Sequence, residues 1–285
     1  MPQTKKSREI TPELIQRFSI YLREQEKSAA TIEKYARDTA ALCGFLNGSP
    51  VNKAILIEWK EGLSRQYAAT SVNTMLAAVN AFLDFTGWTD LKVKPLKIQR
   101  NLFCREEKEL TREEYFRLVR AAGGAGNERL SLVIQTICAT GIRVSELQFI
   151  TIEAVYAGRT AVTCKGKTRT IFLPGKLRQA LVQYAKKQKR TSGPVFITKT
   201  GRPLDRSNIW RDMKSLCESA GVAPGKVFPH NLRHLFARTY YMLEKDLNRL
   251  ADILGHSNVN TTRIYTMESG AAHARQIEHM RLVVT

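Results

Sequence analysis

The stretch Pro229–Thr266, which reads PHNLRHLFARTYYMLEKDLNRLADILGHSNVNTTRIYT, decides how the rest of the chain is interpreted. Its apolar residues recur at the three- and four-residue spacing of a helix. This predicts one helix that Pro229 opens and a second, shorter one that ends at Gly255. The stretch also carries four side chains that can hold or move protons: His230, Arg233, His256 and Tyr265. We expect the two helices to bring these four toward one point.

Two further motifs lie upstream of this stretch. The first, Thr140–Leu147, reads TGIRVSEL and places Arg143 on a turn led by glycine, with Glu146 one helical turn later. The second, Thr163–Arg169, reads TCKGKTR and lies between two short runs that alternate like strands. It predicts a β-hairpin with lysines at its turn. The candidates there are Lys165 and Lys167.

Together these motifs resemble the signature of the tyrosine recombinases, the phage-integrase and Xer family. Its pattern is Thr-Gly-x-Arg-x-Ser-Glu-Leu, a hairpin lysine, His-x-x-Arg, Leu-Gly-His and a tyrosine about nine positions later. All these elements occur here in order, and the resemblance covers essentially the whole chain, although it is diffuse before about residue 110. It implies a site-specific DNA recombinase or integrase that cleaves and rejoins DNA through a 3′-phosphotyrosine intermediate. It also implies four protomers on two double-stranded DNA sites, a Holliday-junction intermediate and no cofactor.

The resemblance also implies the main roles in the reaction. Two guanidiniums can hold the nonbridging oxygens of a phosphate with fixed, forked donors, which favours Arg143 and Arg233 as a clamp. Tyr265 is the expected nucleophile. Because a free tyrosine has a pKa of about 10, neighbouring positive charge or a base must help it to ionise.

The remaining site residues would move protons or support the clamp. Lys165 is the expected general acid for the leaving 5′-oxygen, with Lys167 as the alternative. His230 would assist proton transfer, and His256 would donate a hydrogen bond to a nonbridging oxygen. Glu146 is expected to orient the arginine or the lysine rather than to react.

A metal site is not expected. The three histidines of the opening stretch lack carboxylate or thiol ligands at supporting spacing, and we expect His234 to be structural. The chain contains 5 cysteines, which are scattered and never form a CxxC pair, so zinc and disulfides are not expected either.

The charge of the chain indicates a polyanionic partner. The formal net charge is +19, and the segment 159–214 carries 15 basic residues against only Asp205 and Asp212. A solvated basic face is the alternative, but an imbalance this local favours a surface that contacts phosphates, with nucleic acid ahead of a membrane surface. No apolar run is long enough to span a membrane, and the N-terminus is polar and basic, so we expect a cytoplasmic protein.

The expected fold is mainly α with a small antiparallel β-sheet. We expect a helical, SAM-like core-binding domain at residues 1–92, a linker at 93–109 and an α+β catalytic domain of the tyrosine-recombinase type at 110–285. Thr111 and Glu114 form a capping box that starts the last of these. Its expected elements include strands at 161–163 and 170–173 and helices at 130–140, 176–188, 205–220 and 268–282.

Two alternative functions are compatible with the same motifs. A type IB topoisomerase-like enzyme that nicks and closes DNA would need the same groups, but the short N-terminal domain and the Xer-like spacing disfavour it. A catalytically silent or architectural DNA-binding protein is the other alternative, although every expected catalytic position is filled. Accessory DNA-bending or directionality proteins are candidate partners of a recombinase.

Overall fold

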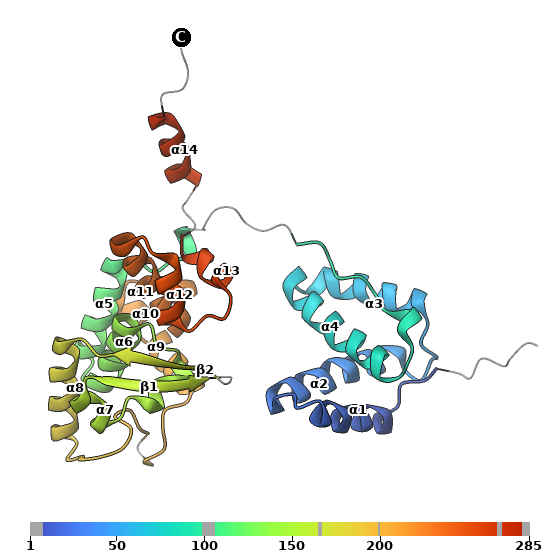
Figure 1. The fold of residues 1–285 in the computed structure, drawn as a ribbon, viewed down its shortest axis with the longest axis horizontal. Helices are drawn as coiled ribbons and strands as arrows, with labels where there is room; N and C mark the ends of the chain where they lie inside the picture. The colour runs from blue at the N-terminus through green and yellow to red at the C-terminus, as the bar shows by residue number, and fades with distance from the viewer. Residues whose placement is uncertain (1–7, 99–105, 165–166, 199, 267–269, 281–285) are drawn as a thin grey trace, which may run out of the picture. The chain divides into compact units, whose positions relative to one another are not determined.

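The computed structural model describes residues 8–98, 106–164, 167–198, 200–266 and 270–280. The chain divides into two compact units, Met1–Arg100 and Asn101–Thr285, and the boundary between them falls inside the expected linker. Both units are built mainly from helices, and the second also holds a two-stranded antiparallel sheet (Figure 1). The predicted fold class is therefore confirmed. Within the described residues, no helix is both long and apolar enough to cross a bilayer.

The N-terminal unit packs its helices around one aromatic and aliphatic core. Its elements are α1 (Pro12–Glu24), α2 (Ala29–Leu46), α3 (Lys53–Gln66), α4 (Ala69–Phe85) and the 3-10 turn η1 (Thr89–Leu91). Thr11 and Ser28 cap the first two helices through their side chains, as the sequence predicts. Phe18 and Phe82 lie fully buried in an edge-to-face pair with ring centroids 5.3 Å apart.

The second unit is arranged around the buried helix α6. Its first elements are η2 (Glu106–Lys108), α5 (Arg112–Gly124), α6 (Glu128–Thr140), η3 (Val144–Phe149), α7 (Ile152–Ala157), β1 (Arg159–Cys164), β2 (Lys167–Phe172) and α8 (Gly175–Lys187). It continues with α9 (Arg206–Lys214), α10 (Cys217–Ala220), η4 (Pro224–Lys226), α11 (Pro229–Glu244), α12 (Leu247–Leu254), α13 (Val259–Thr262), η5 (Arg263–Thr266) and α14 (Gly270–His279). Val133, Ile134 and Ile137 of α6 are fully buried, and α5, α8 and α11 all pack against this helix. The capping box of Thr111 and Glu114 is present at the start of α5.

The hairpin β1–β2 presents alternate residues to the core. Val162 pairs with Arg169 across the ladder, and cross-strand partners share a face. Val162 and Ile171 are buried, so Arg169 also lies on the inward face of the sheet. Strand β2 packs against α12, which places the hairpin beside the turn that follows this helix.

Two predicted helices end elsewhere in the structure. The prediction of one continuous helix at 205–220 is wrong, because α9 ends at Lys214 and α10 begins at Cys217. The chain tightens there: the Leu216 N–H donates to the Met213 carbonyl at 3.2 Å, a three-residue bond that lets both Leu216 and Cys217 enter the core. The last helix ends at His279, before the expected 282, while residues 268–269 and 281–282 of the expected range lie outside the described residues.

Candidate active site

Arg143 is held by the turn that ends helix α6. Gly141 ends this helix with a φ of +63°, in the left-handed region, and a β-carbon there would lie 2.5 Å from the Phe236 ring. Only glycine fits this position without displacing that ring. Arg143 is the N-cap of η3, and its backbone N–H and its Nη1 donate to the two oxygens of Glu146 at 2.8 and 3.0 Å. The Arg143 side chain stays 32% exposed, so its guanidinium remains accessible to a ligand.

Arg233 is the buried counterpart on helix α11. Only 2% of the residue is exposed. Its Nη1 donates to the Gly141 carbonyl, and its Nη2 donates to the Leu254 carbonyl at 2.7 Å. The same Nη2 lies 3.2 Å from His256 Nε2. Burial, together with the charge of Arg143, lowers the pKa of Arg233 to about 10, so the guanidinium is still charged at neutral pH.

His256 follows Gly255, which ends helix α12 with a φ of +65°. Its Nδ1 lies 2.8 Å from the hydroxyl of the buried Thr262. Because Arg233 can only donate, His256 Nε2 accepts from it, and the Nδ1–H donates to Thr262. Burial, with the charges of Arg233 and Arg143, lowers the pKa of His256 to about 4. The imidazole is therefore neutral at pH 7 and must gain a proton, or exchange partners, before Nε2 can donate to a phosphate.

Tyr265 lies in η5 between two imidazoles and is only 3% exposed. Its ring lies 6.0 Å from that of His256 at an interplanar angle of 19° and 4.7 Å from that of His234 at 89°. Burial raises the pKa of the Tyr265 phenol, and the positive charges of Arg233 and Arg143 act in the opposite direction. The phenol is therefore protonated at neutral pH.

His230 completes this group one turn before Arg233. Its ring centroid lies 4.5 Å from that of His234. Although part of the residue faces solvent, loss of solvation and the charges of His234 and Arg233 lower the pKa of His230 to about 4. His230 is thus a free base at pH 7, as a proton acceptor must be.

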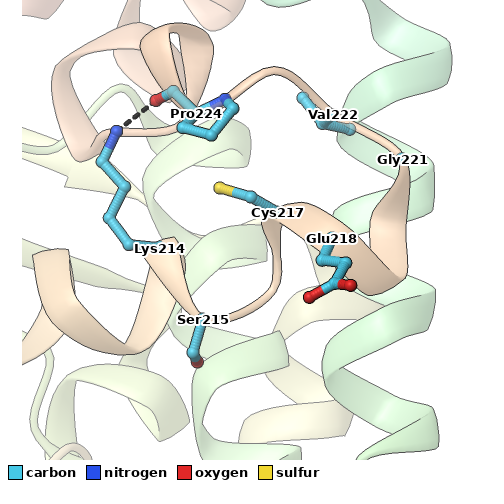
Figure 2. A pocket seen from close by; sticks show the side chains of 7 residues that line it. All are labelled: Lys214, Ser215, Cys217, Glu218, Gly221, Val222 and Pro224. Carbon is cyan, nitrogen blue, oxygen red and sulfur yellow. Dashed lines mark hydrogen bonds between the residues drawn. The ribbon is translucent and has the colours of Figure 1, made fainter.

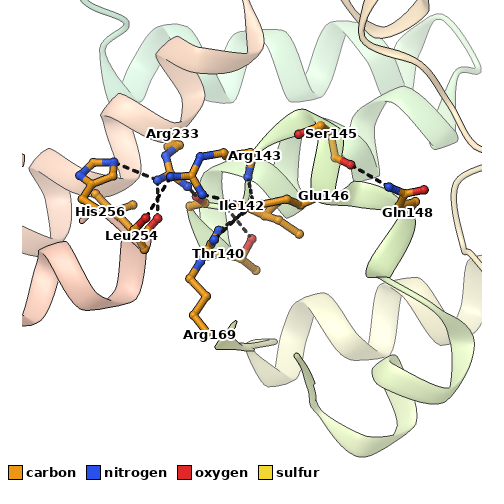
Figure 3. A network of polar contacts seen from close by, with 12 residues as sticks. Thr140, Ile142, Arg143, Ser145, Glu146, Gln148, Arg169, Arg233, Leu254 and His256 are labelled. Atoms are coloured by element: carbon orange, nitrogen blue, oxygen red, sulfur yellow. Dashed lines mark hydrogen bonds and ion pairs between the residues drawn. The ribbon is translucent and has the colours of Figure 1, made fainter. Parts of the chain in front are cut away.

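The structure therefore brings five of the predicted side chains, together with the supporting Glu146, into one connected group, and Figure 3 shows its polar centre. The five are Arg143, His230, Arg233, His256 and Tyr265. Lys165 lies outside the described residues. Lys167 belongs to β2, but its side chain also lies outside the described part.

Two residues that the sequence did not single out lie in the same group. Arg169 donates from Nη1 and Nη2 to the two oxygens of Glu146, at 3.0 and 2.6 Å. The sequence could have indicated Arg169, because strand alternation places it on the inward face of the hairpin, where a charged side chain needs a buried partner. Glu109, from the end of the expected linker, has Oε1 3.7 Å from Nδ1 of His234. The contact with His234 lowers the pKa of Glu109, although burial opposes it.

His234, which we expected to be structural, touches both His230 and Tyr265. It therefore lies within the group rather than behind it.

Elsewhere in the second unit, a pocket of about 510 Å³ is lined from α9 to η4, and Figure 2 shows Lys214 reaching across it to the Pro224 carbonyl. None of the candidate residues lines this pocket, and burial raises the pKa of its Cys217 thiol. In the described part of the chain, no three His, Cys, Asp or Glu side chains are grouped to hold a metal ion.

Comparison with known proteins identifies the family. The model of the phage integrase family matches residues 108–271, and that of the phage integrase N-terminal SAM-like domain matches residues 15–89. Tyrosine recombinase XerA of Pyrococcus furiosus is 30% identical over 284 residues, which is 95% of each chain. Tyrosine recombinase XerC of Roseiflexus castenholzii is 29% identical over 271 residues, covering 85% of this chain and 84% of the relative.

The fold is also similar to that of a solved lambda integrase tetramer bound to a Holliday junction. The TM-score is 0.71 at 18% identity, over 86% of this chain and 77% of that one. The fold and the family model define the class of enzyme, one that breaks and rejoins DNA strands. The chain belongs to the phage integrase family and is a tyrosine recombinase, which carries out site-specific recombination through a tyrosine intermediate.

Proposed function

We propose that Tyr265 is the nucleophile of this recombinase and that Arg143 and Arg233 clamp the scissile phosphate. The observation that carries the proposal is the convergence of two guanidiniums, two neutral imidazoles and a phenol from segments far apart in the sequence. In the transition state the phosphate gains negative charge on its nonbridging oxygens. Two arginines already held in place stabilise that charge without reorganising during the reaction.

In the cleavage step, a bond forms between Tyr265 Oη and phosphorus, and the bond from phosphorus to the 5′-oxygen breaks. His230 takes the phenol proton, because its imidazole is neutral and its ring lies 4.5 Å from that of His234, which in turn lies 4.7 Å from the Tyr265 ring. Lys165 gives a proton to the leaving 5′-oxygen. Rejoining is the reverse reaction with a 5′-hydroxyl from the partner duplex, and because one phosphodiester is exchanged for another, the overall change in free energy is small.

The buried phenol sets one requirement on this step. Tyr265 is 3% exposed, so η5 must shift, or the side chain must turn, before Oη meets a phosphate. Arg143, whose side chain is partly exposed, is placed to contact the incoming DNA before Tyr265 does. His256 then exchanges its hydrogen bond from Arg233 for one to a nonbridging oxygen, helped by the negative charge of the phosphate, which favours its protonated form.

The partner is double-stranded DNA, and we infer a homotetramer on two DNA sites, by analogy with the lambda integrase tetramer on its junction. The formal net charge of +19 supports a phosphate-binding surface. Residues 1–92 act as a core-binding domain that also contacts the duplex, residues 93–109 as the linker and residues 110–285 as the catalytic domain. Accessory DNA-bending or directionality proteins assist at some sites. The reaction takes place in the cytoplasm.

The test is to trap the covalent intermediate. A nicked DNA site loses the short strand that carries the 5′-hydroxyl, so cleaved DNA stays on the protein as an adduct that resists detergent. We expect the wild type to accumulate the adduct and Tyr265→Phe to bind DNA without forming it. Tyr156→Phe, which changes an exposed tyrosine of the same unit, is the control and should form the adduct normally. An undiminished adduct with Tyr265→Phe would move the nucleophile elsewhere.

A further inference from the structure

Arg169 of strand β2 is tied to Arg143 through one buried carboxylate. Glu146 is 3% exposed at its side chain and receives both Nη groups of Arg169 as well as the backbone N–H and Nη1 of Arg143. The Arg169 side chain is itself only 10% exposed. These bonds and the convergence of Arg169 and Arg143 on Glu146 are visible in Figure 3.

The same arginine also supports the turn that carries His256. A β-carbon on Gly255 would lie 2.9 Å from Arg169 Cδ and 3.0 Å from its Nη1, so the two residues are already in close contact. Arg143 Nη2 donates to the Gly255 carbonyl at 3.2 Å. Arg169, Glu146, Arg143 and Gly255 therefore form a closed ring of contacts that joins β2, η3 and the end of α12. We call these four residues the arginine lock.

We propose that Arg169 is a positioning residue for DNA cleavage, which acts through Glu146 to fix the direction of the Arg143 guanidinium and through Gly255 to seat His256. The inference rests on the proposed clamp function of Arg143. Arg169 occupies both carboxylate oxygens of Glu146, so this carboxylate cannot turn to form a forked pair with Arg143. Arg143 keeps one side-chain bond to Glu146 and points its other nitrogen at the turn.

The hydrogen bonds of Arg169 distinguish a positioning role from a direct phosphate contact and from a purely stabilising role. A direct phosphate contact would need free donors facing solvent, but both Nη groups of Arg169 are engaged and nine tenths of the side chain is buried. A role in stability alone would not require contact with both a clamp residue and the turn before His256. Positioning has a large effect on rate, because a displacement of about 1 Å in a catalytic group costs on the order of 10²-fold.

The experiment uses the full chain and measures single-turnover adduct formation at saturating DNA. We expect Arg169→Met to lose on the order of 10²-fold in rate with little change in DNA affinity. Arg169→Lys should recover only part of the loss, because an ammonium cannot bind two oxygens in a fork. Arg117→Met is the matched control: Arg117 donates to the carbonyls of Ala220 and Gly221 at 2.9 and 3.1 Å, and its loss should leave the rate unchanged.

The decisive readout replaces one nonbridging oxygen of the scissile phosphate with a methyl group. Such a methylphosphonate is neutral and develops less negative charge in the transition state. An enzyme that lacks a clamp arginine therefore loses less cleavage rate on this substrate. If Arg169 acts through Arg143, then Arg169→Met and Arg143→Ala should both recover most of their lost rate, and on the same methylphosphonate isomer. If the rate of Arg143→Ala recovers and that of Arg169→Met does not, the positioning role of Arg169 is overturned and the proposed clamp stands. If the rate of Arg143→Ala does not recover, the proposed clamp itself is overturned.

A second variant guards against simple misfolding. Arg169→Met leaves the buried Glu146 with one partner fewer, which destabilises the fold. The double variant Arg169→Met with Glu146→Gln removes the carboxylate charge that has lost this partner and should regain stability. We expect its cleavage rate to stay as low as that of Arg169→Met, because the pair acts as one unit. A stable double variant with the wild-type rate would show that the lock is dispensable.

Discussion

Arg143 and Arg233 carry the same charge, but they differ sharply in burial. Arg233 is 2% exposed and donates to two buried carbonyls, whereas the Arg143 side chain is 32% exposed. We expect both alanine variants to lose on the order of 10²-fold to 10³-fold in cleavage rate while still binding DNA. Arg233→Ala should also destabilise the catalytic unit by about 3 kcal/mol, because the buried carbonyls of Gly141 and Leu254 lose their donors. Arg143→Ala should cost less, because the bonds that it removes from Glu146 and from the Gly255 carbonyl come from a side chain that is 32% exposed.

Urea unfolding measures this difference in stability. The signal is the fluorescence of a chain in which Trp210 is the one tryptophan kept, because Trp59 and Trp88 report on the other unit. Equal stability losses for the two variants would contradict the assignment of Arg233 as the buried member of the clamp. DNA binding that is lost while the residual cleavage rate stays normal would place both arginines in DNA positioning instead.

The two imidazoles of the site make a prediction about pH. The pKa values of His230 and His256 are about 4 in the folded protein, against the ordinary 6.5. The unfolded chain therefore binds more protons between these values, and stability falls as the pH is lowered from about 6.5 toward 4. Above pH 6.5 both states hold neutral imidazoles, and this contribution to stability is fully present.

The measurement is the free energy of unfolding of the catalytic unit at several pH values between 4.5 and 6.5. His230→Gln and His256→Gln should each reduce the slope, and the double variant should reduce it most. Staying above pH 4.5 limits the contribution of the carboxylates Glu109 and Glu146, whose pKa values are lowered. A slope that is unchanged in the double variant would contradict the neutral state of these histidines.

The residues of the site were mostly predictable, and their partners mostly were not. Helical spacing places His230 and Arg233 near the start of one helix and His256 just after the end of a second, which local periodicity can indicate. The contact of Glu109 with His234 joins positions more than 100 residues apart, and nothing in either segment signals it. Arg169 is the intermediate case, since strand alternation could have placed it inward but could not have named Glu146 as its partner.

At the scale of elements, the caps were predictable because they are local. The side chains of Thr11, Ser28 and Thr111 each accept a hydrogen bond from the first turn of the helix they open. The break between α9 and α10 was not predictable, because the helical spacing of apolar residues continues through it and tertiary burial of Leu216 decides the geometry.

The glycine that ends α6 leads to a prediction about stability. Gly141 and Gly221 end their helices at almost the same φ, +63° and +60°, but a β-carbon on Gly141 would clash with Phe236, whereas one on Gly221 would have nothing within 4 Å. Gly221→Ala should cost about 1 kcal/mol, the strain of a left-handed alanine. Gly141→Ala should cost about 3 kcal/mol through the added clash.

Gly141→Ala should also slow cleavage, because the carbonyl of residue 141 holds Arg233. Thermal unfolding and the rate of adduct formation, measured on both variants, test this. If the two alanine variants behave alike in stability and in rate, the turn after α6 does not position the clamp.

At the scale of the molecule, composition and the order of motifs indicated the function. The net charge of +19 indicated a polyanion, and the motifs in their order indicated the family, which the matches to residues 15–89 and 108–271 confirm. What composition cannot supply is the convergence of distant segments. The site depends on bonds such as that from Arg143 to the Gly255 carbonyl, which joins positions 112 residues apart.

The central claim is that Tyr265 becomes covalently attached to DNA, and peptide mapping of the trapped adduct tests it most directly. The adduct is digested with trypsin and nuclease, and the peptide that carries the remaining nucleotide is sequenced by mass spectrometry. We expect the modification in the peptide that follows Arg263 and ends at Arg275, on Tyr265, the sole tyrosine of that peptide. A nucleotide attached to any other residue, in a chain whose Tyr265 is unmodified, would contradict the claim.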